Sequence, residues 1–173
     1  MKTFIDRLQA AIQADQTISA YNADRVIVVT EDDLSRHDGA AFAIETGTLF
    51  VIHDLLQHES HPEHEELGRD CSKFTATITA VQKAAGGIDE TGMQETGITG
   101  DGNLPGIVKM QTDLWTLLWK NGFLNLFPDA AGENYLWDLE IGEAGERSAI
   151  QDEESLFITS SRQIVGHRWQ FYW

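Results

Sequence analysis

Residues 72–82, SKFTATITAVQ, constrain the fold of this 173-residue chain more than any other stretch. Apolar and polar side chains alternate strictly over 74–80, and the threonines fall on the side opposite to Phe74, Ala76, Ile78 and Ala80. Successive side chains of a β-strand point to opposite faces of a sheet, so the pattern is typical of a strand that is buried on one face. We therefore expect a sheet with one apolar face that a second layer must cover.

Two amphipathic stretches can supply that layer. TFIDRLQAAIQ repeats apolar residues at helical spacing, and Thr3 with Asp6 approximates a capping box, which predicts a helix over 3–14. LPGIVKMQTDLWTLLWKNGF has the same periodicity and places Gly122 where a C′ glycine belongs, which predicts a second helix near 105–121. The apolar face of this second helix consists of Ile107, Met110, Leu114, Leu117 and Leu118.

Further β-rich runs lie at RVIVVT, GTLFVIHDL, YLWDLEIG and the C-terminal LFITSSRQIVGHRWQFYW. Their order around the two helices predicts the α+β class, with a mostly antiparallel sheet packed by the N-terminal helix and the helix near 105–121. We expect a single domain, 1–173, with long loops near 56–70, 84–103 and 142–155.

Acidic residues dominate the charge of the chain. Its 28 Asp and Glu against 12 Lys and Arg give a formal net charge of -16 and a pI of about 4.5. A field of this sign repels nucleic-acid phosphate and argues against a DNA-reading role. It suits contact with a basic partner, and a saline habitat is a second interpretation.

The remaining global features concern location. No stretch has the roughly 18 to 20 apolar residues of a membrane span. Asp6, Arg7 and Gln9 interrupt the N-terminal apolar pattern, so we expect no signal peptide. A single cysteine, Cys71, allows no internal disulfide. We therefore expect a protein that is made in a cytoplasm, makes no contact with a membrane and folds without oxidation.

The segment HDLLQHESHPEHEELGRDC raises the question of a metal site. It holds four histidines among carboxylates, namely His53, His58, His61 and His64. Imidazole and carboxylate groups are ligands for zinc and other transition metals, so a small metal-dependent enzyme that uses this cluster is one hypothesis. The spacing differs from HExxH, however, and a proline separates the last two histidines.

The same segment also has a structural interpretation. Ser60 and Glu63 form a capping box, Pro62 falls in the first turn and Gly68 ends the segment, which predicts a short solvated acidic helix. Cys71 lacks the local signature of a nucleophile, and there is no phosphate loop, dinucleotide motif or G-x-S-x-G elbow. We therefore assign no catalytic residue, no metal ligand and no cofactor, and expect the protein not to be an enzyme.

Aromatic residues indicate a surface for a partner or a second subunit. Trp and Tyr are enriched at interfaces, and the terminal HRWQFYW places three large aromatics on one face of a strand. A core face is the alternative interpretation of that strand. The candidate interface residues are Trp115, Trp119, Trp169, Phe171 and Trp173.

The order of elements resembles that of the tail terminator proteins of long-tailed bacteriophages and related tailed viruses. The matching stretches are TFIDRLQAAIQ, TLFVIHDL, SKFTATITAV, MQTDLWTLLWKNGF, an acidic excursion and SSRQIVGHRWQFYW. The resemblance implies a structural virion protein that forms a hexameric ring. This ring would cap the tail tube and join it to the neck or connector, with DNA passing through an acidic channel that does not grip it.

The resemblance implies a location at the tail–neck region of the virion, and partners that are the tail tube protein, the neck or connector protein and further copies of the chain. A head-completion or neck stopper protein of the same particles is the near alternative. A cytoplasmic binding module whose acidic surface takes a basic protein is a third hypothesis, from a different class.

Overall fold

The computed structural model describes residues 2–22, 26–30, 48–60, 69–83, 97–100, 105–126, 135–152 and 155–171. Its helices are α1 (Lys2–Ala14), α2 (Gln16–Asn22) and α5 (Gly106–Leu126). Its strands are β1 (Val26–Thr30), β2 (Thr48–Ser60), β3 (Arg69–Lys83), β4 (Tyr135–Ala144), β5 (Ser148–Asp152) and β6 (Ser155–Phe171). No helix in these described ranges is long and apolar enough to cross a membrane.

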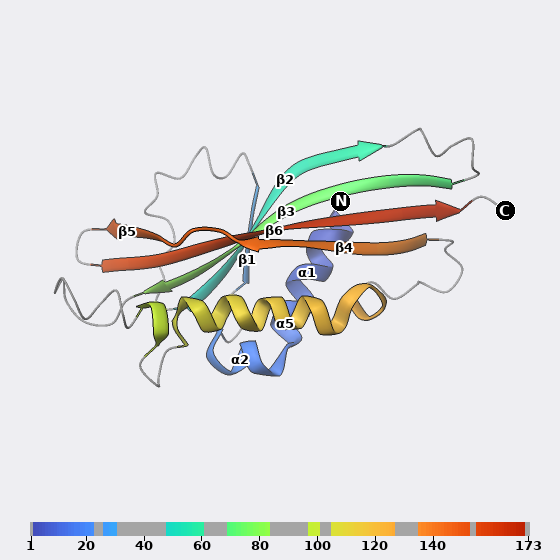
Figure 1. Ribbon diagram of the computed structural model, residues 1–173. Coiled ribbons are helices and arrows are strands. Elements are labelled where there is room, and N and C mark those ends of the chain that lie inside the picture. The colour runs from blue at the N-terminus through green and yellow to red at the C-terminus, as the bar shows by residue number, and fades with distance from the viewer. Residues whose placement is uncertain are drawn as a thin grey trace.

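The strands form one sheet in the order β1-β2-β3-β6-β4, and β5 also pairs with β6. The β1–β2 pair is parallel, while the pairs β2–β3, β3–β6, β4–β6 and β5–β6 are antiparallel. The helices lie on one side of the strands, with α1 and α5 packed against the sheet (Figure 1). The predicted class is therefore confirmed: the fold is α+β, with a mostly antiparallel sheet covered by the N-terminal helix and the second long helix.

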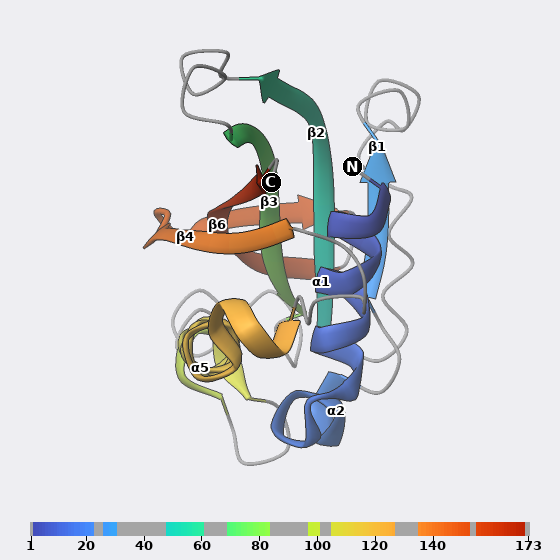
Figure 2. The same cartoon turned by 90° about the vertical axis from the view of Figure 1, so that its right-hand side faces the viewer.

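The alternation in SKFTATITAVQ selects the face that meets the helices. Its four apolar side chains are buried in the core, whereas Thr77 and Thr79 on the opposite face are half-buried. The five apolar residues predicted for α5 are buried in the same cluster, together with Phe4 and Leu8 of α1. Figure 2 shows α1 running alongside β1 and β2 while α5 lies under β4 and β6. The core is thus the layer between the helices and one face of the sheet.

A glycine in β6 makes room for an aromatic ring of α1. Gly166 pairs in register with Phe74 of β3 and with Leu139 of β4. The ring of Phe4 occupies the space above it, because a Cβ placed on Gly166 would lie 2.3 Å from Phe4 Cε2. Phe4 also stacks on Phe74, with 6.0 Å between ring centroids. The absence of a side chain at Gly166 therefore determines how closely α1 approaches the sheet.

Two details of the helices differ from the sequence-based expectation. The second long helix continues to Leu126 and does not end at Gly122. A single interior glycine costs only about 1 kcal/mol, too little to end a helix whose next residues favour it. The short helix α2 was not predicted, although Asp15 caps it by accepting hydrogen bonds from the N–H groups of Thr17 and Ile18, both at 2.9 Å.

Strands also occupy parts of the predicted loops. In the loop expected near 56–70, β2 continues to Ser60 and β3 begins at Arg69, so Ser60 is a strand residue and not a helix cap. The excursion near 142–155 contains the end of β4 and all of β5. Within 84–103, residues 97–99 form a helical turn, and 84–96 and 101–103 lie outside the described residues. Strand pairing with β3 and β6 extends these segments beyond what local composition indicates.

A polar contact ties α2 to α5. The hydroxyl of Tyr21 donates to Asp113 Oδ2 at 3.1 Å, and Lys109 Nζ lies 2.5 Å from the same oxygen and 5.4 Å from the Tyr21 ring centroid. Burial, reinforced by the negative charge of Asp113, raises the pKa of Tyr21 well above its ordinary value of 10.0. The folded protein therefore holds this proton more tightly than the unfolded chain does.

This contact predicts a pH-dependent loss of stability. The stabilisation from Tyr21 is complete below about pH 10. Above that pH the tyrosine of the unfolded chain ionises first, so the free energy of unfolding falls by up to about 1.4 kcal/mol per pH unit. Tyr21→Phe should cost about 1 kcal/mol at pH 8 for the lost hydrogen bond, with a smaller difference from wild type above pH 10. Urea unfolding at pH 8 and at pH 10.5 measures this, and a difference that is independent of pH would refute the assignment.

Candidate functional site

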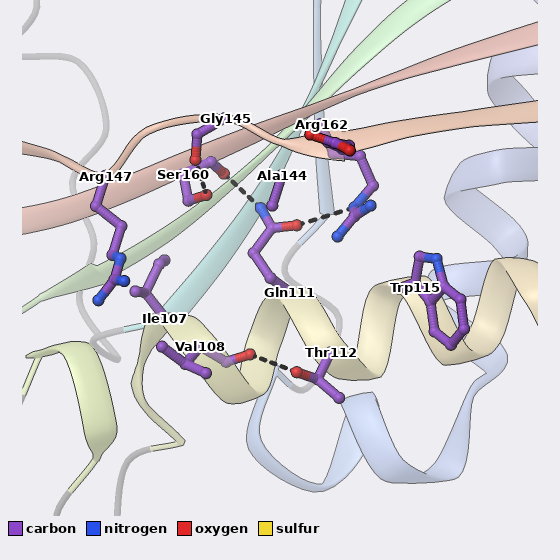
Figure 3. Close-up of a pocket in the computed structure, with 11 residues that line it drawn as sticks. Ile107, Val108, Gln111, Thr112, Trp115, Ala144, Gly145, Arg147, Ser160 and Arg162 are labelled. Atoms are coloured by element: carbon purple, nitrogen blue, oxygen red, sulfur yellow. Dashed lines mark hydrogen bonds between the residues drawn. The ribbon is translucent and has the colours of Figure 1, made fainter.

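A pocket of about 530 Å³ lies between α5 and the edge of the sheet where β4 gives way to β5 (Figure 3). It is lined by Ile107, Val108, Gln111, Thr112 and Trp115 from α5, by Glu143, Ala144, Gly145 and Arg147 from the end of β4 and the following link, and by Ser160 and Arg162 from β6. We call it the Arg162 pocket. Its volume falls within the range of roughly 300 to 1,000 Å³ that is common for ligand sites.

An interruption in the sheet edge creates this pocket. β4 and β5 pair with β6 one after the other, and the register of β4 shifts between Ile141 and Ala144. Gly142 lies in this shift, where a Cβ would approach the carbonyl oxygen of Gln163 to 3.0 Å. The link closes back on β6 through the Gly145 N–H, which donates to the Ser161 carbonyl at 2.6 Å. Bulges of this kind turn side chains and carbonyls away from the regular ladder.

Gln111 joins α5 to β6 at the back of the pocket. Its Nε2 donates to the Ser160 carbonyl at 2.7 Å, and its Oε1 accepts from Arg162 Nε at 3.2 Å. Arg162 Nη1 also donates to the Gly142 carbonyl at 2.6 Å. Figure 3 shows the two side chains pointing toward one another, Gln111 from the helix and Arg162 from the sheet. The network holds the guanidinium in one orientation at the pocket wall.

Two guanidinium groups give the pocket a positive character. Arg162 is only 8% exposed, and burial lowers its pKa from the ordinary value. Arg147 is exposed and extends from the link toward the start of α5 (Figure 3). Within the described part of the chain neither arginine forms an ion pair. The exposed carboxylate-bearing residue Glu143 also lines the pocket. An anionic group is the ligand chemistry that this arrangement favours.

An aromatic surface adjoins the pocket. Trp115 and Trp119, four residues apart on α5, stack with ring centroids 5.5 Å apart and an angle of 9° between their planes. They are 41% and 69% exposed, and Trp115 also lines the pocket. Exposed large aromatic side chains are a feature of protein–protein interfaces. The apolar patch of Trp115 and Trp119 is therefore continuous with the cationic Arg162 pocket.

The predicted interface residues do not form one surface. Arg162, Ile164 and Gly166 belong to the buried, helix-side positions of β6, so alternation places Trp169 on the opposite face, where it is half-buried. Trp169 pairs in register with Cys71 of β3 and is not part of the core beneath the helices. Phe171 is the last residue of β6, and Trp173 lies outside the described residues. Trp115 and Trp119 thus form an interface candidate separate from Trp169.

The histidine cluster is only partly described. His53 and His58 lie in β2, in register with Thr77 and Phe74 of β3, and the register shifts between them. His61 and His64 lie outside the described residues. Among the residues that are described, no group of three or more His, Cys, Asp or Glu is placed to hold a metal ion. The metal hypothesis stays a prediction, and elemental analysis of protein purified without chelators tests it.

Local sequence patterns do not predict the Arg162 pocket, although the sequence carries a signal for it. Gln111 interrupts the apolar face of α5, and Ser160 and Arg162 occupy core-facing positions of β6 between Ile158 and Ile164. Polar residues at core positions are unusual unless they pair with each other or serve a ligand. Their partnership across 51 residues, however, becomes visible only in the folded chain.

Comparison with known proteins does not assign the site. No protein-family model matches the chain, and no curated protein has a similar sequence. The features that bear on function are therefore the geometry of the Arg162 pocket, the adjoining tryptophans and the order of elements along the chain.

Proposed function

We propose that this chain is a structural assembly protein of a tailed virus, namely a tail terminator that forms a ring on the end of the tail tube. The observation that supports it best is the exposed Trp115–Trp119 stack on α5, which adjoins the cationic pocket between α5 and the edge of the sheet. A surface of this kind suits contact with another protein chain. The α+β fold, with its two long helices on one face of the sheet, agrees with the resemblance in element order.

In this proposal the copies join head to tail in a closed ring, so that the surface around α5 contacts a different surface of the next subunit. The tail tube protein and the neck or connector protein are the further partners. The net charge of -16 suits a ring through which DNA passes without being held. The place of action is the tail–neck region of the virion, after synthesis in the host cytoplasm.

The direct test is to mix the purified protein with tail tubes of the virus and to examine them by negative-stain electron microscopy and native mass spectrometry. We expect six-fold rings that cap the tube ends. Rings that bind filled heads but not tubes would instead identify a neck stopper. A strictly monomeric protein that joins neither particle would refute both functions.

A paired substitution tests the surface itself. Trp115→Ala combined with Trp119→Ala should weaken ring assembly by about 30-fold, the equivalent of about 2 kcal/mol for an aromatic hot spot. Analytical ultracentrifugation over a range of concentrations measures the effect, and Gln13→Ala at an exposed position of α1 is the control. Unchanged assembly in the double variant would exclude this surface from the subunit interface.

A further inference from the structure

We infer that the Arg162 pocket receives an Asp or Glu carboxylate from a second copy of this chain. The inference rests on the proposed ring assembly and specifies the contact through which neighbouring subunits bind. Its occupant is an acidic segment of the adjacent subunit, which enters between α5 and the link that follows β4.

Arg162 can donate more hydrogen bonds than its partners among the described residues accept. A guanidinium has five N–H donors, and in the described part of the chain Arg162 makes two hydrogen bonds, to Gln111 and to the Gly142 carbonyl. Both of these acceptors are neutral, so among the described residues they hold the positive charge in place without neutralising it. The Arg162 side chain, which carries the remaining N–H donors, lines the open cavity. A carboxylate suits such a guanidinium because it accepts two parallel hydrogen bonds.

The burial of the Arg162 charge has a free-energy cost that a carboxylate would reduce. Arg162 is 8% exposed, and its guanidinium forms no ion pair with the residues that the structure describes. A buried charge without a counter-ion is destabilising, and a carboxylate brought in by a partner removes part of that penalty. Arg147, exposed on the link, adds a second positive charge that attracts the same group.

The charge of the chain itself points to a second copy as the occupant. The chain carries 28 acidic against 12 basic residues, so the surface of another copy is rich in carboxylates. Two of the basic residues, Arg147 and Arg162, line this one pocket against a single acidic residue, Glu143, so the lining carries a net positive charge on an acidic protein. Trp115 lines the pocket and stacks on Trp119 outside it, so a segment that enters the pocket also covers exposed aromatic surface. Charge complementarity of this kind sets the register between subunits in an interface.

A site-specific cross-link tests the occupant. p-Benzoylphenylalanine is introduced in place of Thr112, an exposed residue that lines the pocket, and the full-length protein is irradiated at assembly concentration. We expect a covalent dimer whose cross-linked peptide contains Asp or Glu of the second copy. The same photoreactive residue in place of Ala10, exposed on α1, is the control for random collisions.

Charge variants test the chemistry. Arg147→Gln and Gln13→Glu change the net charge by the same amount, and both residues are exposed. We expect Arg147→Gln to weaken self-association about fivefold, as for an ion pair of about 1 kcal/mol, whereas Gln13→Glu should have little effect. Arg162→Gln should lower the cross-link yield at least as much as Arg147→Gln. Circular dichroism checks its fold, and the Arg147 variant keeps the test valid if Arg162→Gln does not fold.

The possible outcomes test the occupant of the pocket and the tail terminator function independently. A ring that caps tail tubes but shows no cross-link between copies at position 112 overturns the pocket assignment and leaves the terminator function intact. A cross-link through the pocket in a protein that caps no tube supports the pocket and refutes the function. A monomer that carries a small acid in the pocket, visible as added mass in native mass spectrometry, overturns the second copy as occupant.

Discussion

Gly166→Ala should lower the free energy of unfolding by about 2 to 3 kcal/mol, although it adds a single methyl group. The new Cβ would lie 2.3 Å from Cε2 and 2.9 Å from both Cδ2 and Cζ of Phe4. Phe4 is fully buried and stacks on Phe74, and the close packing of protein interiors leaves such a ring little room to move. Either α1 shifts away from the sheet or the ring leaves its preferred rotamer. Urea unfolding measures the loss as a lower midpoint.

A double-mutant cycle separates this clash from a general effect of alanine in β6. Phe4→Leu removes the ring atoms that the new methyl group would meet, and it costs stability of its own. In the Phe4→Leu background we expect the cost of Gly166→Ala to fall by at least about 1 kcal/mol, since residues in direct contact couple. Strict additivity of the two substitutions would show that the close approach does not determine the stability.

Leu114→Ala should be the second large effect, with a loss of about 2 to 5 kcal/mol in the free energy of unfolding. Leu114 is fully buried in the layer between α5 and the sheet, and truncation leaves a cavity there. The loss is measured by urea unfolding at pH 8, below the range in which Tyr21 contributes a pH dependence.

Trp119→Ala is the matched control on the same helix. Trp119 is 69% exposed, so its truncation should change stability by less than about 1 kcal/mol, mostly through the lost stacking on Trp115. Equal losses for Leu114→Ala and Trp119→Ala would mean that Trp119 is part of the core of the isolated chain. That result would also remove the main support for a subunit interface at this surface.

Most of the fold follows from local patterns. The alternation in β3 identifies its buried face, and the helical periodicity of α1 and α5 identifies the residues that cover it, because each pattern is complete within about 20 residues of sequence. Local signals at Ser60 and Gly122 do not match the structure. Both carry local stop or cap signals, yet Ser60 pairs with Ser72 of β3, and α5 continues through Gly122. At Ser60 the pairing with β3 outweighs the local cap signal, whereas at Gly122 the cost of one interior glycine, about 1 kcal/mol, is too small to end the helix.

Some residues of the candidate site are also predictable from local spacing, whereas others depend on contacts between distant segments. Trp115 and Trp119 were identified from their spacing on one helix, since residues four apart share a face. Arg162, Gln111 and Arg147 were not, because the pocket depends on a register shift in β4 and on a helix and a strand that are 51 residues apart in the chain. The alternating pattern at Trp169 distinguishes the two faces of the strand. It does not predict which of these faces the helices cover.

The amino-acid sequence by itself determined the class of the fold, the apolar face of β3, the two helices that pack on it and the strongly acidic charge. These properties depend on the order of neighbouring residues and on composition. Only the tertiary structure decided that Gly166 accommodates Phe4, that β4 and β5 follow one another along β6, and that Arg162 lies buried beside an open pocket. These features depend on which distant segments pair, and free energies of packing and strand pairing across the whole chain select that arrangement.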